Sequence, residues 1–145
     1  MGPPGHLRIR AELGELAGLR EFVRTGLVRM GASAQCVDEL VQAVDEAATN
    51  SIVHGYAGAP GWLDVSLSSD GDRCEVTIVD DAPIFDPTDV PEPDLALPPA
   101  VRAPGGMGVH LIRLAVDAVD HRPRPGGGNI LTMVRSLGTR AEEGE

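Results

Sequence analysis

The sequence contains no lysine, few aromatic residues, two cysteines and no long apolar run, and each scarcity excludes a class of protein. Arginine supplies all 12 basic residues against 22 acidic ones, which gives a formal charge of −10. Nucleic acids and anionic membranes are bound through basic surfaces, so the charge argues against both as main partners. Aromatic residues make up 3% of the chain and apolar residues 42%, so we expect an aliphatic core.

The spacing of Cys36 and Cys74 does not fit a disulfide framework or a metal site, because no second cysteine or histidine lies at ligand spacing from either. We expect both to be buried free thiols. No apolar run of about 18 residues is present, and residues 1–5 lack the charged-then-apolar pattern of a signal peptide. The expectation from sequence is a soluble, cytoplasmic protein.

The length of 145 residues suits one domain with its own core, which we place at about 6–137 of a single 1–145 unit. Alternating apolar residues predict strands at 6–11, 62–67, 74–79, 118–121 and 129–135. Apolar residues at helical spacing predict helices at 13–30, 34–54 and 109–116. This order is typical of an α+β domain, with a mostly antiparallel sheet and three helices packed on one face.

The segment 84–104 contains the prolines that separate the two halves of this pattern. Pro87, Pro91, Pro93, Pro98, Pro99 and Pro104 exclude a regular helix or strand there. A loop of about twenty residues in a compact domain is often a lid or a binding segment. The alternative is a disordered surface insertion.

The stretch 45–54 lies late in the second predicted helix and carries the most informative polar residues. A stripe of apolar residues precedes and accompanies it: Val37, Leu40, Val41, Val44, Ala48 and Ile52. Glu46 points almost opposite this stripe, and Asn50 projects beside Glu46 one turn later. The pair is either part of a solvated outer face or an acid and an amide that project together into a polar site. The features that follow favour the polar site.

Asp80, Asn50 and the glycine segment 105–108 each suit one part of a nucleotide. Asp80 ends a predicted strand, where a carboxylate can accept a hydrogen bond from an exocyclic amine such as that of adenine; alternatively it begins a turn. The helix after Gly108 starts with unpaired backbone N–H groups, which suit phosphates. Asn50 offers a neutral oxygen to Mg²⁺, and Glu46 could orient or deprotonate a hydroxyl nucleophile.

Three ordered motifs resemble the ATP site of the GHKL (Bergerat) superfamily. They are Glu46-x-x-x-Asn50, Asp80-x-Ala82 and Gly105-Gly106-Met107-Gly108 with its helix. Within that superfamily, the small size and the phrases at 45–56 and 81–87 are similar to the anti-sigma-factor serine-protein kinases. The resemblance covers about residues 6–137.

This resemblance implies a Bergerat-type two-layer sandwich with a long ATP lid at about 84–104. It implies that Glu46 is the general base of a serine/threonine kinase, that Asn50 binds Mg²⁺ and that Asp80 reads the adenine amino group of ATP or ADP. Such proteins typically form homodimers, bind a sigma factor and phosphorylate a serine or threonine of an anti-sigma-factor antagonist. The other ATP-binding positions that it implies are Ala82, Arg102, Gly105, Gly106, Met107, Gly108 and Asn129.

The chain departs from the family pattern at three positions. Ala82 and Ile84 occupy the glycine positions of Asp-x-Gly-x-Gly, and Asn129 stands where relatives often place a threonine near adenine. Alanine adds a methyl group and does not readily adopt positive φ. Ile84 and Phe85 either narrow the pocket or line it.

The departures keep a second interpretation open, in which the chain is a non-catalytic nucleotide-binding module that switches between partners. Retention of Glu46 and Asn50 favours the enzyme, whereas the missing glycines favour the module. A fragment of a sensor histidine kinase fits poorly, because His6 lies in a predicted strand and no dimerising helical hairpin precedes it. We interpret His54 as a cap at the helix end before Gly55, with no catalytic role.

Overall fold

The computed structural model of the chain describes residues 5–86, 96 and 106–138. Arg102, Gly105 and most of the predicted lid lie outside these residues. Of Gly106 and Met107 only the backbone is described. The strands are β1 (Gly5–Arg10), β2 (Trp62–Ser69), β3 (Arg73–Asp80), β4 (Ala118–Pro123) and β5 (Asn129–Ser136). The α-helices are α1 (Leu16–Arg29), α2 (Ala34–Asn50) and α3 (Gly106–Ala115), with a 3₁₀ turn at Leu13–Glu15 and a π-helix at Ser51–Gly55.

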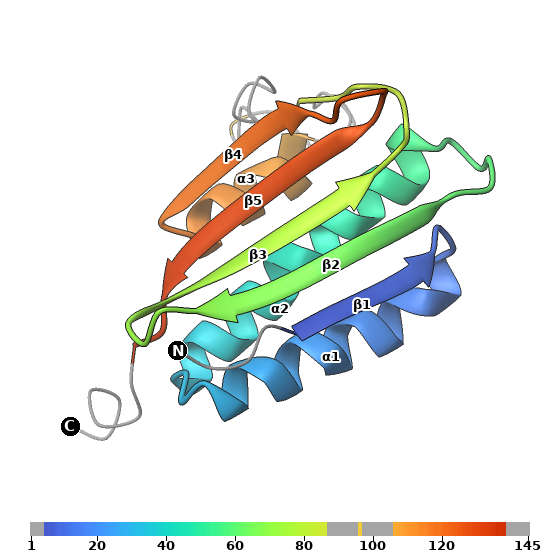
Figure 1. Cartoon of the computed structure of the whole chain (residues 1–145). Coiled ribbons are helices and arrows are strands. Elements are labelled where there is room, and N and C mark those ends of the chain that lie inside the picture. Colours follow the sequence, from blue (N-terminus) through green and yellow to red (C-terminus); the bar gives the residue numbers. More distant parts are fainter. Residues whose placement is uncertain (1–4, 87–95, 97–105, 139–145) are drawn as a thin grey trace.

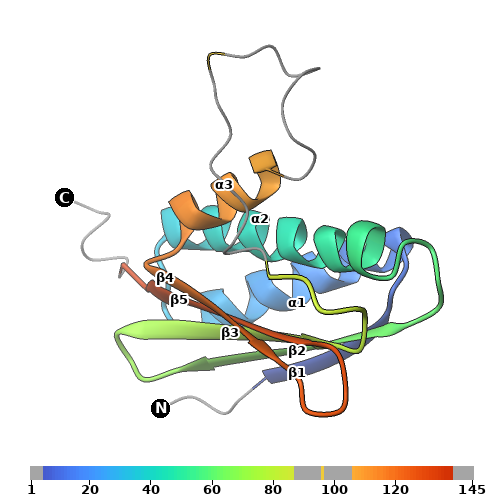
Figure 2. The ribbon, with the colours of Figure 1, turned by 90° about the horizontal axis from the view of Figure 1, so that it is seen from above.

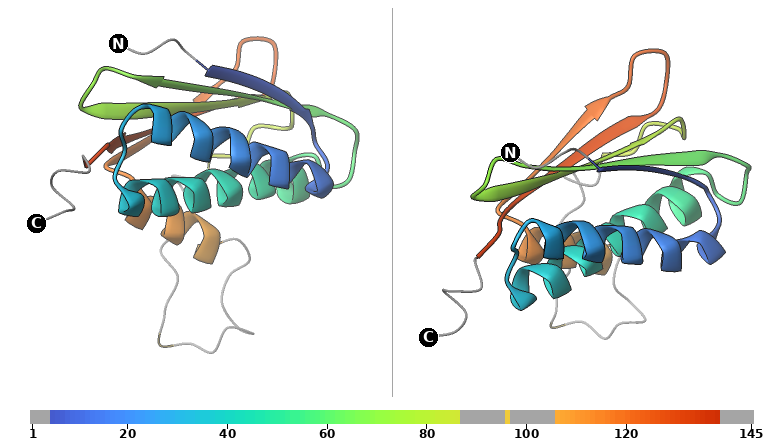
Figure 3. Two further views of the ribbon diagram at one scale, coloured as in Figure 1. Left: turned by 90° about the horizontal axis from the view of Figure 1, so that it is seen from below. Right: turned by 60° about the horizontal axis from the view of Figure 1, so that its bottom comes forward.

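The five strands form one antiparallel sheet in the order β1-β2-β3-β5-β4 (Figure 1). All three helices cover the same face of this sheet, so the described part of the molecule has two layers (Figure 2). Helix α2 lies between α1 and α3 and contacts both (Figure 3). The predicted α+β architecture is confirmed.

The boundaries of α2 follow from local chemistry. Its N-cap is Ser33, whose side chain accepts a hydrogen bond from the Cys36 backbone N–H at 3.0 Å, as the sequence predicts. At the other end the helix widens into the π-helix, which ends at Gly55, where the sequence predicts the break. A π-helical turn is rare in proteins, and where one occurs it often lies at a functional site.

The core lies between the helices and the inner face of the sheet. The apolar stripe of α2 packs there against Leu63, Val65 and Val76, all of which are fully buried. Cys36 and Cys74 are both buried and free, which confirms that expectation. Within the described residues, no helix combines the length and hydropathy needed to cross a membrane.

The predicted start of the third helix was wrong. Helix α3 begins at Gly106, so Gly108 lies in its first turn and not in the loop before it. Glycine lowers helix propensity, which is why the sequence favoured a later start. The helix forms because its apolar residues Val109 and Ile112 are buried, and packing outweighs propensity.

Replacement of Leu19 tests the core on α1. Leu19 is 0% exposed and Leu13 is 56% exposed. We expect Leu19→Ala to lower the free energy of unfolding by about 2–5 kcal/mol because it leaves a cavity. The matched variant Leu13→Ala should change it by less than about 0.5 kcal/mol. Urea denaturation followed by circular dichroism measures both, and equal losses would contradict this placement of the core.

Candidate functional site

An open pocket lies where the end of α2 and the π-helix face the sheet. It contains about 430 Å³ of space, part of which is open solvent. Its polar lining includes Asn50, Asp80, His121 and Asn129. The rest of the lining is Ala47, Ser51, Gly55, Ile78, Phe85, Ile112 and Leu131. Apolar walls with a few convergent polar groups are what a flat heterocyclic ligand needs.

Asp80 is a buried charged residue of this pocket. It ends β3 opposite Asn129, the first residue of β5, and is 3% exposed. Its Oδ1 accepts hydrogen bonds from the Ala82 backbone N–H at 3.1 Å and from Asn129 Nδ2 at 2.9 Å. Among the described residues, no donor contacts its second carboxylate oxygen. That oxygen is therefore available to accept a hydrogen bond from a ligand.

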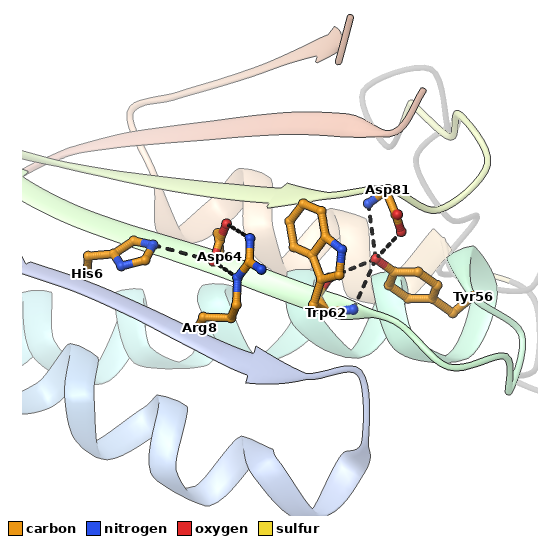
Figure 4. A network of polar contacts seen from close by, with 6 residues as sticks. All are labelled: His6, Arg8, Tyr56, Trp62, Asp64 and Asp81. Carbon is orange, nitrogen blue, oxygen red and sulfur yellow. Dashed lines mark hydrogen bonds and ion pairs between the residues drawn. The ribbon is translucent and has the colours of Figure 1, made fainter. Parts of the chain in front are cut away.

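Tyr56 fixes the chain on either side of the pocket. Its buried hydroxyl accepts hydrogen bonds from the backbone N–H of Asp81 at 3.0 Å and of Trp62 at 3.3 Å (Figure 4). The same oxygen lies 2.7 Å from the Trp62 carbonyl and 3.0 Å from Asp81 Oδ1, so it donates to one of them. One side chain thus joins the end of the π-helix, the start of β2 and the residue after Asp80.

Ala82 fits its position without strain. Among the described residues other than glycine, positive φ occurs at Ala57 only, so Ala82 does not need the conformational freedom of glycine. It is 2% exposed and faces Gly55, where an added Cβ would lie 3.1 Å from the Ala82 methyl carbon. The backbone strain expected of an alanine at this position is therefore absent. Ile84 is 61% exposed and does not line the pocket, whereas Phe85 does.

Glu46 and Asn50 face the first turn of α3 and not open solvent. A Cβ built on Gly108 would lie 2.9 Å from Glu46 Oε2 and 3.8 Å from Asn50 Oδ1. Glycine at this position therefore lets the two helices approach closely around these side chains. Burial, and then the charge of Asp45, raises the pKa of Glu46 above the usual range of a glutamate.

Asn50 has the features of a ligand-binding residue. Its Nδ2 is buried and has no hydrogen-bond partner among the described residues. Native structures rarely leave such a group unpaired unless a water or ligand completes it. The described residues contain no group of three or more histidine, cysteine or acidic side chains suited to a metal. A magnesium ion here would use the Asn50 oxygen, waters and phosphate oxygens, the ligand set it often adopts beside nucleotides.

The structure brings Asn50, Asp80 and Asn129 into one pocket and places Glu46 beside the start of α3, whereas Ala82 is buried next to Gly55 and does not line the pocket. His54 is exposed in the π-helix and does not line the pocket. Sequence reasoning missed Tyr56 and His121. Only the pairing of β4 with β5, which places His121 opposite Leu131, brings that histidine to the pocket.

Comparisons with known proteins show which proteins the chain is similar to. The family model of histidine kinase-like ATPase domains matches residues 9–135. The anti-sigma F factor of Thermoanaerobacter sp. (strain X514) is 21% identical over 83% of this chain and 84% of its own. The serine/threonine-protein kinase BtrW of Bordetella bronchiseptica is 30% identical over 70% of this chain and 71% of its own.

A solved structure supports the fold alone. The crystal structure of the RsbU and RsbW domains of a Mycobacterium tuberculosis protein superposes with a TM-score of 0.67 at 20% identity. The match covers 94% of this chain, which spans 33% of the longer one. The similarity therefore concerns one part of that protein.

Gly128 tests how closely the β4–β5 turn approaches the pocket. Its φ is +110°, and an added Cβ would overlap the Asp80 carbonyl oxygen; Gly127 has φ +115° with nothing near its Cβ position. Both alanine variants should lose about 1–3 kcal/mol of unfolding free energy to backbone strain. We expect Gly128→Ala to lose at least about 1 kcal/mol more, because the backbone must shift. Equal urea midpoints for the two variants would refute the close approach.

Proposed function

Because the chain belongs to the family of histidine kinase-like ATPase domains, we propose that its pocket binds ATP or ADP and that the protein is an anti-sigma-factor serine/threonine kinase. Its partners would be a sigma factor and the antagonist whose serine or threonine accepts the phosphoryl group. Two relatives, an anti-sigma F factor and a serine/threonine-protein kinase, support this assignment. A homodimer in the cytoplasm, as the sequence resemblance implies, is part of the proposal.

The observation that carries the proposal is the convergence of Asp80, Asn129 and Asn50 on one pocket, with Glu46 next to the first turn of α3. The purine would lie between the apolar walls, with its exocyclic amine donating to the open oxygen of Asp80. Its phosphates would then point toward Asn50 and the start of α3. The N-terminus of that ten-residue helix favours anions through its unpaired N–H groups and its dipole.

The remaining motif residues complete the proposed phosphate site. Four further residues precede Gly108 in the sequence. On the strength of the motif, we assign to the triphosphate Arg102, Gly105, Gly106 and Met107. Gly108 belongs to the same motif, and its lack of a side chain also leaves room for the Glu46 carboxylate. A bound Mg²⁺ would neutralise phosphate charge during transfer. Asn50 would hold that ion through its amide oxygen.

Glu46 would act as the base in the transfer step. Its carboxylate accepts the proton of the partner's serine or threonine hydroxyl, whose oxygen attacks the γ-phosphorus of ATP. The bond between that phosphorus and the bridging oxygen of ADP breaks, so the products are a phosphorylated partner and ADP. Positioning and charge neutralisation supply most of such catalysis, which is why one base and a few binding groups suffice. The negative φ of Ala82 supports this proposal over a non-catalytic module, because alanine causes no backbone strain there.

The first test of this function is phosphoryl transfer to the candidate antagonist. Glu46→Gln should lower transfer by about 100-fold or more while ATP affinity changes by less than about threefold, because only the base is lost. The matched variant Glu21→Gln, at a 72% exposed side chain on α1, should behave as wild type. Radiolabelled ATP measures transfer, and isothermal titration calorimetry measures binding.

Two results would contradict the proposal. If the wild-type protein binds no ATP at millimolar concentration, the proposed nucleotide binding is wrong. If Glu46→Gln transfers phosphate at the wild-type rate, Glu46 is not the base.

The pH dependence of transfer tests the environment of Glu46. Its raised pKa means that the carboxylate gains its active, deprotonated form only above the pH at which an ordinary glutamate does so. Transfer should therefore rise with pH through this elevated pKa. Asp45→Asn removes the neighbouring negative charge and leaves Arg20, 2.8 Å from that carboxylate, uncompensated. The lost negative charge and the uncompensated arginine both lower the pKa of Glu46. The rise of the transfer rate with pH should therefore occur at lower pH in this variant. An unchanged profile, or a shift to higher pH, would contradict the assignment.

A further inference from the structure

The side-chain amide of Asn129 is held at both ends inside the pocket. Its Nδ2 donates to Asp80 Oδ1 at 2.9 Å and to the Pro83 carbonyl at 3.2 Å. Its Oδ1 accepts from the Phe85 backbone N–H at 2.9 Å and lies 2.7 Å from His121 Nε2. Asn129 is 7% exposed, so these contacts are shielded from water.

The direction of the His121 contact follows from its partner. An amide oxygen can only accept, so the proton must reside on Nε2 of His121. The imidazole side chain is 2% exposed and comes from β4, next to the strand that carries Asn129. Its other nitrogen, Nδ1, lies 3.7 Å from Asp86 Oδ2. The ring thus lies between Asn129 and Asp86, with its hydrogen bond to Asn129.

The two donors on Oδ1 allow only one orientation of the Asn129 amide. If the amide turned over, its NH₂ group would face the Phe85 N–H and His121 Nε2–H, and its oxygen would face the Asp80 carboxylate. Both changes replace hydrogen bonds with like-polarity contacts in a buried place. His121 therefore fixes Asn129, and Asn129 in turn fixes Asp80 Oδ1.

We infer that His121 is a positioning residue for nucleobase selectivity, which keeps the pocket in a form that accepts a 6-aminopurine and disfavours a 6-oxopurine. The inference rests on the proposed function, because it concerns the base of the same nucleotide. With Oδ1 of Asp80 occupied by protein donors, the second oxygen is presented to the ligand as an acceptor. An exocyclic amine satisfies it, whereas a carbonyl oxygen at the same position would be repelled.

Binding of ATP and ITP by histidine variants tests this role. His121→Leu fills similar space without a donor, His121→Gln retains an N–H donor, and His6→Leu is the control at an exposed histidine of β1. We expect the ratio of the ITP to the ATP dissociation constant to fall about fivefold or more in His121→Leu, mainly through weaker ATP binding. The ratio should stay within about twofold of wild type in His121→Gln and in His6→Leu. Calorimetric titration of the full chain with Mg²⁺ and each nucleotide gives these values.

The outcomes separate this inference from the proposed function. A wild-type protein that binds neither nucleotide overturns both. A wild-type protein that prefers ATP, with the same preference in His121→Leu or an equal loss for both nucleotides, overturns the inference alone.

A measurement on the wild type covers the case in which His121→Leu does not fold. In ¹⁵N-detected NMR, the His121 ring should carry a proton on Nε2. A neutral ring with its proton on Nδ1 and a bare Nε2 would overturn the inference.

Discussion

The buried contact between Asp80 and Asn129 is the constraint on which the pocket depends. These residues face each other at the ends of β3 and β5, and their side chains share a hydrogen bond of 2.9 Å. The contact commits one carboxylate oxygen to the protein, and the other has no donor among the described residues. A buried carboxylate is tolerated only when hydrogen bonds satisfy it, so the surrounding donors determine what kind of ligand can enter.

A second constraint comes from the way α2 is enclosed. This helix lies between α1 and α3, buries its apolar stripe on the sheet and carries Glu46 and Asn50 on the side toward α3. Gly108 lets α3 approach both polar side chains, and that approach contributes the burial that raises the pKa of Glu46. The same helix thus stabilises the fold with one face and presents its functional groups with another. In the proposed kinase, this places the base and the metal ligand at the phosphate end of the purine pocket.

The periodicity of the apolar residues and the spacing of the motif residues were enough to predict the fold and the residues that carry strong local signals. The stripe from Val37 to Ile52 predicted which face of α2 is buried, and Ser33 predicted where that helix begins. The motif around Glu46 and Asn50 predicted two side chains that the structure places beside α3. These features depend on neighbours within a turn or two, so a single sequence contains them.

Features that depend on contacts between distant segments could not be predicted in the same way. Nothing near His121 in the sequence marks it as a pocket residue; its place follows from strand pairing and from Asn129, eight residues later. Likewise, Tyr56 reaches Asp81 only because the π-helix ends beside β2 and β3. The suspected backbone strain at Ala82 is absent because its φ is not positive, and Gly55, from a separate segment, leaves space for its methyl group. The predicted start of α3 was wrong because burial of Val109 and Ile112 outweighs the low helix propensity of the glycines.

The most direct test of the central claim is a crystal structure of the protein with Mg²⁺ and a non-hydrolysable ATP analogue. The account predicts that the adenine amino group lies within hydrogen-bond distance of the open Asp80 oxygen, with Asn50 on the metal and the phosphates at the start of α3. A nucleotide bound elsewhere, or an adenine whose amino group points away from Asp80, would contradict it.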